Sequence, residues 1–513
     1  MPKILTAGPP WRVILSFAVP LLVGNVVQQL YQVVDAIVVG RVLGVDALAA
    51  VGATGSLLFL LLGFAWGMTS GFAIPTAQAF GAGDAAAVRR SVATGTVLTA
   101  AASVLLTVLA PLLAAPALRL MQTPAELVPQ ATTFAVISFL GASTMMSFNF
   151  LAAILRAIGD SRTPLVFLTL SCLLNIALVI ALVAGLGFGV GGAAFASVIS
   201  QATSVGLCLV HVQRRVQVLH PHHDDWRVTR DDVARHLRIG LPMGFQASII
   251  AIGALAVQVR LNSLGAEAVA AYTTAVRVDG LAVALLASLG LAVSTFVAQN
   301  YGAGRPDRIR LGVRQAAGMA VVGALLLAAV LITAGSSIIG LFVGPGEQQV
   351  VAMASFYLQA NGACYLLLGV LFVLRGALQG LGDTFIPTLT GVIELAMRVG
   401  AAVVLGAAFG FSGVVWGNPL AWVGAVVVLV PAYLRAQRRL AASPAPVAGP
   451  LPEVLVSEGP TVGSVVLDAV VLVPLGDGVH ESTRLEFASG APRADGSGER
   501  ATGASCKFSG TYR

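Results

Sequence analysis

The chain has 513 residues, of which 57% are hydrophobic and only 10% are charged, with a net charge of +7. Soluble domains carry about 25% charged residues, so this composition excludes a soluble globular protein. The positive excess lies in short segments between apolar runs, where it would attract anionic lipid headgroups, and we expect no nucleic-acid partner.

Long apolar runs dominate the chain. Runs of 18 or more residues predict membrane-spanning helices. Twelve such runs are centred near residues 25, 63, 103, 142, 175, 202, 251, 287, 325, 363, 397 and 423. The sequence therefore predicts an all-α membrane protein with twelve transmembrane helices.

The second half of the chain repeats the first. LGVDALAAVG from Leu43 corresponds to LGAEAVAAYT from Leu264, and FGAG from Phe80 to YGAG from Tyr301, an offset of 221 residues in each case. Six spans per copy return the chain to its starting side, so the halves should form parallel repeats. We expect two pseudo-symmetric six-helix lobes.

The domain boundaries follow from this repeat. We place the N-lobe at residues 1–215, an inter-lobe linker at 216–238 and the C-lobe at 239–440. Residues 441–513 are rich in Ala, Pro, Gly and Ser, and this composition predicts a disordered tail.

Lys and Arg residues gather on one side of the predicted helices, and that side includes both termini and the linker. Because positive charge near the membrane stays in the cytoplasm, both termini and the linker should be cytoplasmic. Arg375 falls on this side in the predicted topology, whereas Arg277 falls on the other.

Asp35 in the first helix is the sharpest candidate for chemistry. Gln28, Tyr31 and Asp35 are spaced i, i+3 and i+7, so an amide, a phenol and a carboxylate share one helix face. A charge at mid-bilayer costs about 3 kcal/mol or more unless it faces a cavity. Asp35 therefore predicts an ion-coupling site, and a structural Asp near Arg41 is the alternative.

Neutral polar residues follow in the first half. Asn175 lies in the fifth span, Ser197 and Gln201 share a face of the sixth, and Asn149 lies in the fourth. They either complete a cation or proton site with Asp35 or act as packing contacts between helices.

The second half is polar at other positions. Asp279 opens the eighth span and needs a partner or a wet cavity, because Arg277 lies only two residues away and points elsewhere. Glu394 lies four residues before Arg398, the favourable order for an ion pair on a helix. The two residues either neutralise each other as a structural ion pair or contact the substrate.

No enzyme motif is present. The chain has neither a GxxxxGK[ST] phosphate loop nor an HExxH metal site, so we expect no enzyme, no cofactor and no metal centre other than a Na⁺ site.

Four segments together resemble the multidrug and toxic compound extrusion (MATE) family. They are LYQVVDAIVVGRVLGVDALAAVG from Leu30, FVAQNYGAGRPDR from Phe296, LRAIGDSRTP from Leu155 and LQGLGDTFIP from Leu378. The resemblance covers about residues 10 to 440. It implies a monomeric efflux antiporter of the bacterial inner membrane that exports cationic, amphipathic drug-like compounds by alternating access in exchange for H⁺ or Na⁺.

The resemblance also assigns roles to residues. Asp35 matches the family's coupling acid, Asn175 an Asn of the same site, and Ser197 a position that is Thr in some members. Many bacterial members carry an Asp one turn after the Asn, where this chain has Val179. A site with one acid should bind Na⁺ more weakly, so H⁺ is the expected coupling ion, with Na⁺ at Asp35 and Asn175 as the alternative.

A flippase for lipid-linked sugars or phospholipids is the alternative function. Anionic headgroups would require several arginines in the cavity, and the sequence places only Arg398 deep within a helix.

Overall fold

The computed structural model describes residues 4–121, 123–341 and 347–442. All regular structure in these residues is helical. The first half of the chain forms α1 (Pro10–Leu43), α2 (Val45–Gly81), α3 (Ala85–Leu120), α4 (Val128–Leu140), α5 (Ala142–Ala157), α6 (Arg162–Val179), η1 (Ile180–Gly185) and α7 (Gly189–Arg215).

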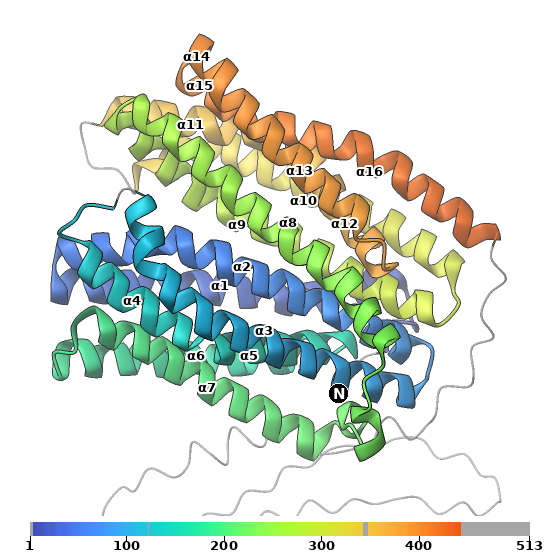
Figure 1. Cartoon of the computed structure of the whole chain (residues 1–513). Coiled ribbons are helices and arrows are strands. Elements are labelled where there is room, and N and C mark those ends of the chain that lie inside the picture. Colours follow the sequence, from blue (N-terminus) through green and yellow to red (C-terminus); the bar gives the residue numbers. More distant parts are fainter. Residues whose placement is uncertain (1–3, 122, 342–346, 443–513) are drawn as a thin grey trace, which may run out of the picture. The chain divides into compact units, whose positions relative to one another are not determined.

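Two short turns, η2 (Gln217–Leu219) and η3 (His223–Trp226), connect this half to the second. The second half forms α8 (Arg230–Ser263), α9 (Ala266–Gly302), α10 (Pro306–Gly340), α11 (Gln348–Ala363), α12 (Tyr365–Gly380), α13 (Phe385–Gly400), η4 (Ala401–Leu405), α14 (Gly406–Phe409), α15 (Phe411–Val415) and α16 (Gly417–Ala442). Figure 1 shows the two sets of helices as separate groups, with α2, α8 and α9 where they meet.

The predicted number of spans is confirmed. Ten helical segments of the described chain are long and apolar enough to cross a membrane, and two bent pairs bring the number to twelve. The pair α4 and α5 bends by 46° and the pair α11 and α12 by 52°. These bends occupy corresponding places in the two halves.

Glycine makes the tight turns at one end of each lobe. Gly44 between α1 and α2 has φ 91°, and Gly265 between α8 and α9 has φ 101°. Residues with a side chain rarely adopt this backbone region, which explains glycine at both positions of the repeat. The opposite end of the bundle carries η2, η3 and the start of α1, and we call it the linker end (right in Figure 1).

The lobes meet along α2 and α8, where glycines let the two backbones touch. A Cβ on Gly67 would lie 2.4 Å from the carbonyl oxygen of Met243, and one on Gly71 would lie 2.6 Å from the Cα of Gly240. Small residues at such crossings permit the close packing that holds helices together in lipid.

The linker is docked rather than extended. Val218 and Leu219 are buried against the N-lobe, and the Arg89 Nε lies 3.0 Å from a carboxylate oxygen of Asp225. Thr229 caps α8 through the backbone N–H of Asp232, so α8 begins at Arg230, inside the predicted linker 216–238. The predicted tail 441–513 lies outside the described residues except for 441 and 442, which end α16.

A GxxxG motif packs α12 against α9 within the C-lobe. A Cβ on Gly376 would lie 2.2 Å from the carbonyl oxygen of Gly290, and one on Gly380 would lie 2.4 Å from that of Ser294. Both contacts are with backbone, which cannot rotate away. The two helices therefore depend on the absence of side chains here.

We expect Gly376→Val to destabilise the protein by at least about 1–3 kcal/mol, the usual cost of overpacking, because the neighbour is backbone. The melting temperature of the purified protein in detergent measures the loss. Gly318→Val is the matched control, since nothing lies within 4 Å of a Cβ on Gly318 in α10. An equal loss in both variants would show that the crossing is not the cause.

Linker docking should depend on pH through Asp225. Burial raises the pKa of this carboxyl, but hydrogen bonds from the His222 backbone N–H and from Arg89 outweigh it, and the net pKa lies below its ordinary value. Because the pKa is lower in the folded state, the ionised carboxylate stabilises the docked linker at pH values above about 3.9, the pKa of an unfolded Asp. This stability is lost as the pH falls through the folded pKa. The hydrogen-exchange protection factors of the amides of residues 222–227, which compare the measured rate with the intrinsic rate at the same pH, should therefore fall below about pH 4. Asp225→Asn should give fast exchange already at neutral pH.

Candidate functional site

A polar cluster lies inside the N-lobe, where α1, α6 and α7 meet. The hydroxyls of Tyr31 and Ser197 are 2.7 Å apart. The Asn175 Nδ2 donates to the Ser197 Oγ at 3.1 Å and to the Tyr31 hydroxyl at 3.4 Å. The structure thus brings together three residues that the sequence singled out on three different helices.

Asn175 retains an unused acceptor. Its side chain is buried to 1% exposure, and its Oδ1 has no hydrogen-bond partner in the described part of the chain. A buried carbonyl without a donor carries a desolvation penalty of about 1–3 kcal/mol, which a cation or a water molecule would relieve. Val179, one turn further along α6, is fully buried and apolar, so it offers this acceptor nothing.

Asp35 lies one turn beyond Tyr31 on α1 and is half-buried. No basic side chain of the described residues forms an ion pair with its carboxylate, and Arg41, the neighbour that the structural alternative required, forms none with it. Asp35 therefore brings a negative charge that this lobe does not neutralise.

The remaining N-lobe candidates do not join the cluster. Gln28 is exposed on α1, and Gln201 lies one turn past Ser197 on α7 without a hydrogen bond to the cluster. Asn149 on α5 is half-buried, and its Nδ2 is buried without a partner among the described residues.

Asp279 in the C-lobe is held by tyrosines. It is 6% exposed on α9, and it accepts hydrogen bonds from the hydroxyl of Tyr365 and, at 3.4 Å, from that of Tyr357. The Asn418 Nδ2 donates to the Tyr357 hydroxyl at 3.0 Å. The partner that Asp279 was expected to need is thus a pair of tyrosine hydroxyls. Arg277 is exposed and forms no ion pair with Asp279 among the described residues.

Sequence reasoning missed both tyrosines because they lie in an apolar region with no charge nearby. They flank the bend at Cys364, so a partner for Asp279 could have been sought there.

Glu394 binds two arginines rather than one. Arg375 on α12 contacts one carboxylate oxygen directly, and the Arg398 Nη2 lies 3.6 Å from the other. Arg375 is 7% exposed and also donates to the Thr390 Oγ at 3.3 Å. The prediction that only Arg398 lies deep in a helix was wrong, because Arg375 lies within α12, five residues before its end at Gly380, and its side chain is buried.

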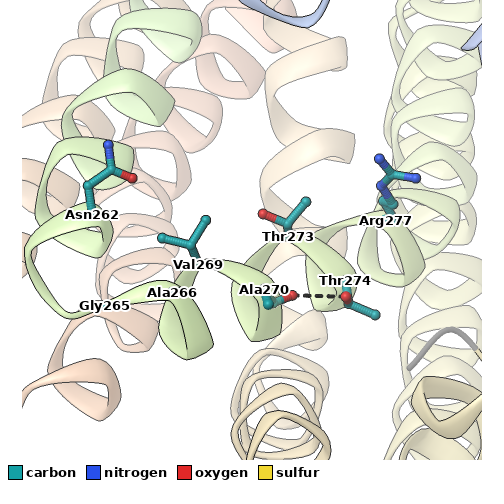
Figure 2. Close-up of a pocket in the computed structure, with 8 residues that line it drawn as sticks. All are labelled: Asn262, Gly265, Ala266, Val269, Ala270, Thr273, Thr274 and Arg277. Atoms are coloured by element: carbon teal, nitrogen blue, oxygen red, sulfur yellow. Dashed lines mark hydrogen bonds between the residues drawn. The ribbon is translucent and has the colours of Figure 1, made fainter. Parts of the chain in front are cut away.

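A cavity lies at the α8 and α9 turn, away from the linker end. Its volume is about 590 Å³ and its lining includes Asn262, Thr273 and Arg277. Figure 2 shows these three side chains pointing to the same side of the helical hairpin. All the residues that line this cavity belong to α8, α9 and the turn between them.

The chain is similar to known proteins along both halves. The sequence profile named MatE matches residues 20–181 and 242–404. A relative in Bacillus subtilis (strain 168), the probable multidrug resistance protein YoeA, is 31% identical over 75% of this chain and 84% of its own length. The multidrug export protein MepA of Staphylococcus aureus (strain NCTC 8325 / PS 47) is 23% identical over 80% of this chain and 90% of its own.

The fold agrees with solved structures. A MATE crystal structure in complex with MaL6 superposes with a TM-score of 0.78 at 24% identity, covering 85% of this chain and 98% of the other. The profile matches each lobe once, and one relative is 31% identical to the chain, so the family is established. The chain belongs to the MatE family and is a multi-pass membrane transporter of the MATE (multidrug and toxic compound extrusion) type, not an enzyme.

Proposed function

We propose that the protein exports cationic, amphipathic drug-like compounds in exchange for protons, by alternating access, with Asp35 as the coupling carboxylate. Asn175 and Ser197, with Tyr31, form the polar end of the same site. The names of the relatives, which refer to multidrug resistance and multidrug export, support this class of cargo.

The observation that carries the proposal is the unpaired charge of Asp35. The C-lobe acids are compensated, Glu394 by two arginines and Asp279 by two phenols. A half-buried carboxylate with no such partner is stabilised in an apolar lobe by taking up a proton or a cation. Its charge can therefore differ between the two ends of a transport cycle.

The donor set favours H⁺ over Na⁺. A hard cation requires several oxygen ligands, preferably anionic ones. The site offers the Asp35 carboxylate, the Asn175 Oδ1 and hydroxyls, whereas the position one turn after Asn175 is occupied by the buried Val179. A proton needs only the carboxylate. Na⁺ bound at Asp35 and Asn175 is the alternative coupling ion, and the transport experiment below distinguishes it from H⁺.

The contacts between the lobes support an arrangement closed at the linker end. Within the described residues, the hydrogen bonds that join one lobe to the other involve Asn25, Leu60 or residues nearer the linker end. The 590 Å³ cavity lies at the opposite end. With the linker end cytoplasmic, as the arginine distribution predicts, this is an outward-open state in a bacterial inner membrane with both termini inside.

The cavity also constrains how a cationic cargo is oriented. Arg277 is exposed and lines the cavity, so it repels a cation beside the α8 and α9 turn. Asp35 on the N-lobe attracts one. A cationic cargo therefore binds with its charge toward the N-lobe and competes with the proton for the same carboxylate.

The C-lobe arginines do not favour a lipid flippase. Arg375 and Arg398 both lie deep in the C-lobe, but Glu394 neutralises one of their two charges, so the cluster keeps a single net positive charge rather than the several that an anionic headgroup requires. The proposed transporter works as a monomer in the lipid bilayer and needs no cofactor beyond its coupling ion.

Asp35→Asn should abolish export driven by a pH gradient while the protein still folds and inserts, because the amide cannot exchange a proton. Proteoliposomes with an imposed pH gradient or an imposed Na⁺ gradient, loaded with a fluorescent organic cation, measure this directly. Asp46→Asn is the matched control, since Asp46 is an exposed acid at the start of α2. Undiminished pH-driven export by the Asp35 variant would refute the coupling role, and export driven only by Na⁺ in the unmodified protein would replace H⁺ with Na⁺.

Glu394→Gln should cost stability rather than coupling. Removing one partner of a buried ion pair costs about 3–5 kcal/mol, and here it leaves two arginines without a carboxylate. We expect a clearly lower melting temperature in detergent, with the surviving protein still driven by the pH gradient. A variant of normal stability that ignores the pH gradient would place coupling in the C-lobe instead.

A further inference from the structure

Gln78 on α2 joins the N-lobe to the C-lobe at the linker end. Its Nε2 donates to the backbone carbonyl of Gly380 at 3.1 Å, and its Oε1 accepts from the Arg235 Nη2 at 3.0 Å. Both partners belong to the C-lobe, on α12 and α8. The amide is 7% exposed, and its donor and its acceptor are both used.

Gln299 on α9 makes the reciprocal connection. Its Nε2 donates to the backbone carbonyl of Ala157 at 2.7 Å, and its Oε1 accepts from the backbone N–H of Leu5 at 3.0 Å. Ala157 belongs to the N-lobe, whereas the backbone carbonyl of Leu5 is itself bound by Asn300 and Arg308 of the C-lobe, and Gln299 is fully buried. It lies 221 residues after Gln78, the offset of the internal repeat. Ala157 and Gly380 also correspond, since they end α5 and α12 two residues before Gly159 and Gly382.

Two glycines bring these residues together. A Cβ on Gly81 would lie 1.9 Å from the carbonyl oxygen of Gln299, and a Cβ on Gly302 would lie 1.8 Å from that of Gln78. The contact is reciprocal, and any side chain at either position would force α2 and α9 apart. The crossing therefore has the same two-fold relation as the hydrogen bonds.

We propose that Gln78 and Gln299 form a two-fold amide clamp that closes the linker end of the transport path, and that both halves release together when this end opens. The proposal rests on the alternating access proposed above. Three of the four hydrogen bonds, those to Gly380, Arg235 and Ala157, join the two lobes, so a rigid-body separation of the lobes breaks these three in one step.

A small void lies between the lobes beside the two glutamines. About 30 Å³ is lined by residues of α2, α5, α8 and α9, including Ala77 and Ala298, the neighbours of the two glutamines in sequence. Ser294 also lines this void and is 5% exposed. Once the clamp opens, water from the linker end reaches Ser294.

The experiment reads this access directly. The full chain, with its four cysteines replaced by serine and Ser294→Cys as reporter, is placed in inside-out membrane vesicles. A membrane-impermeant maleimide then labels the reporter from the linker end. Gln78→Met and Gln299→Met keep the side-chain length and remove the amide. Gln258→Met is the matched control, since Gln258 bonds only to Asn262 within α8 among the described residues.

We expect the labelling rate to rise about tenfold or more in the double variant and by an intermediate factor in each single variant, because Gln78 contributes two inter-lobe hydrogen bonds and Gln299 contributes one. The Gln258 variant should match the parent. Unchanged labelling in the single variants, or an equal rise in the control, overturns the clamp. The single variants decide the matter if the double variant does not fold. Labelling needs neither cargo nor an ion gradient, so this result is independent of whether Asp35 couples to H⁺.

Discussion

The cost of an unpaired charge in an apolar surrounding organises this transporter. Inside the C-lobe, Glu394 is neutralised by Arg375 and Arg398, and Asp279 is held by the hydroxyls of Tyr357 and Tyr365. Such pairs fix the packing of α9, α12 and α13, because breaking one leaves a stranded charge. Asp35 has no comparable partner among the described residues, which is why the proposed function places the change of protonation in the N-lobe.

The duplication explains why the scaffold is symmetric and the chemistry is not. The bends at Gly141 and Cys364, the turns at Gly44 and Gly265, and the Gln78 and Gln299 contacts recur in both lobes. These features define how helices turn and how the lobes meet, and both lobes need them equally. Polar side chains within a lobe are under no such constraint. Asn175 on α6 and Arg398 on α13 occupy corresponding positions, yet one is a neutral amide and the other is a cation.

The sequence was sufficient for everything that depends on periodicity and repeat. Twelve spans and the two lobes followed from apolar runs and from the internal repeat. The family resemblance assigned Asn175 and Ser197 to one site, and the two side chains are hydrogen-bonded to each other. Long-range pairing was not accessible in this way. Arg375 was assigned to the arginine-rich side because it lies near a turn, yet its side chain points inward to Glu394 on the next helix. No local pattern records which tyrosines of a bent helix pair face Asp279.

Helix α1 connects the two ends of this arrangement. Leu5, just before α1, donates its backbone N–H to Gln299 at the linker end, and Tyr31 and Asp35 lie further along the same helix in the N-lobe site. Pro20 lies between them and cannot donate a backbone hydrogen bond, so the helix is weakened there. A protonation change at Asp35 and the release of Gln299 therefore act on one helix with a weak point between them.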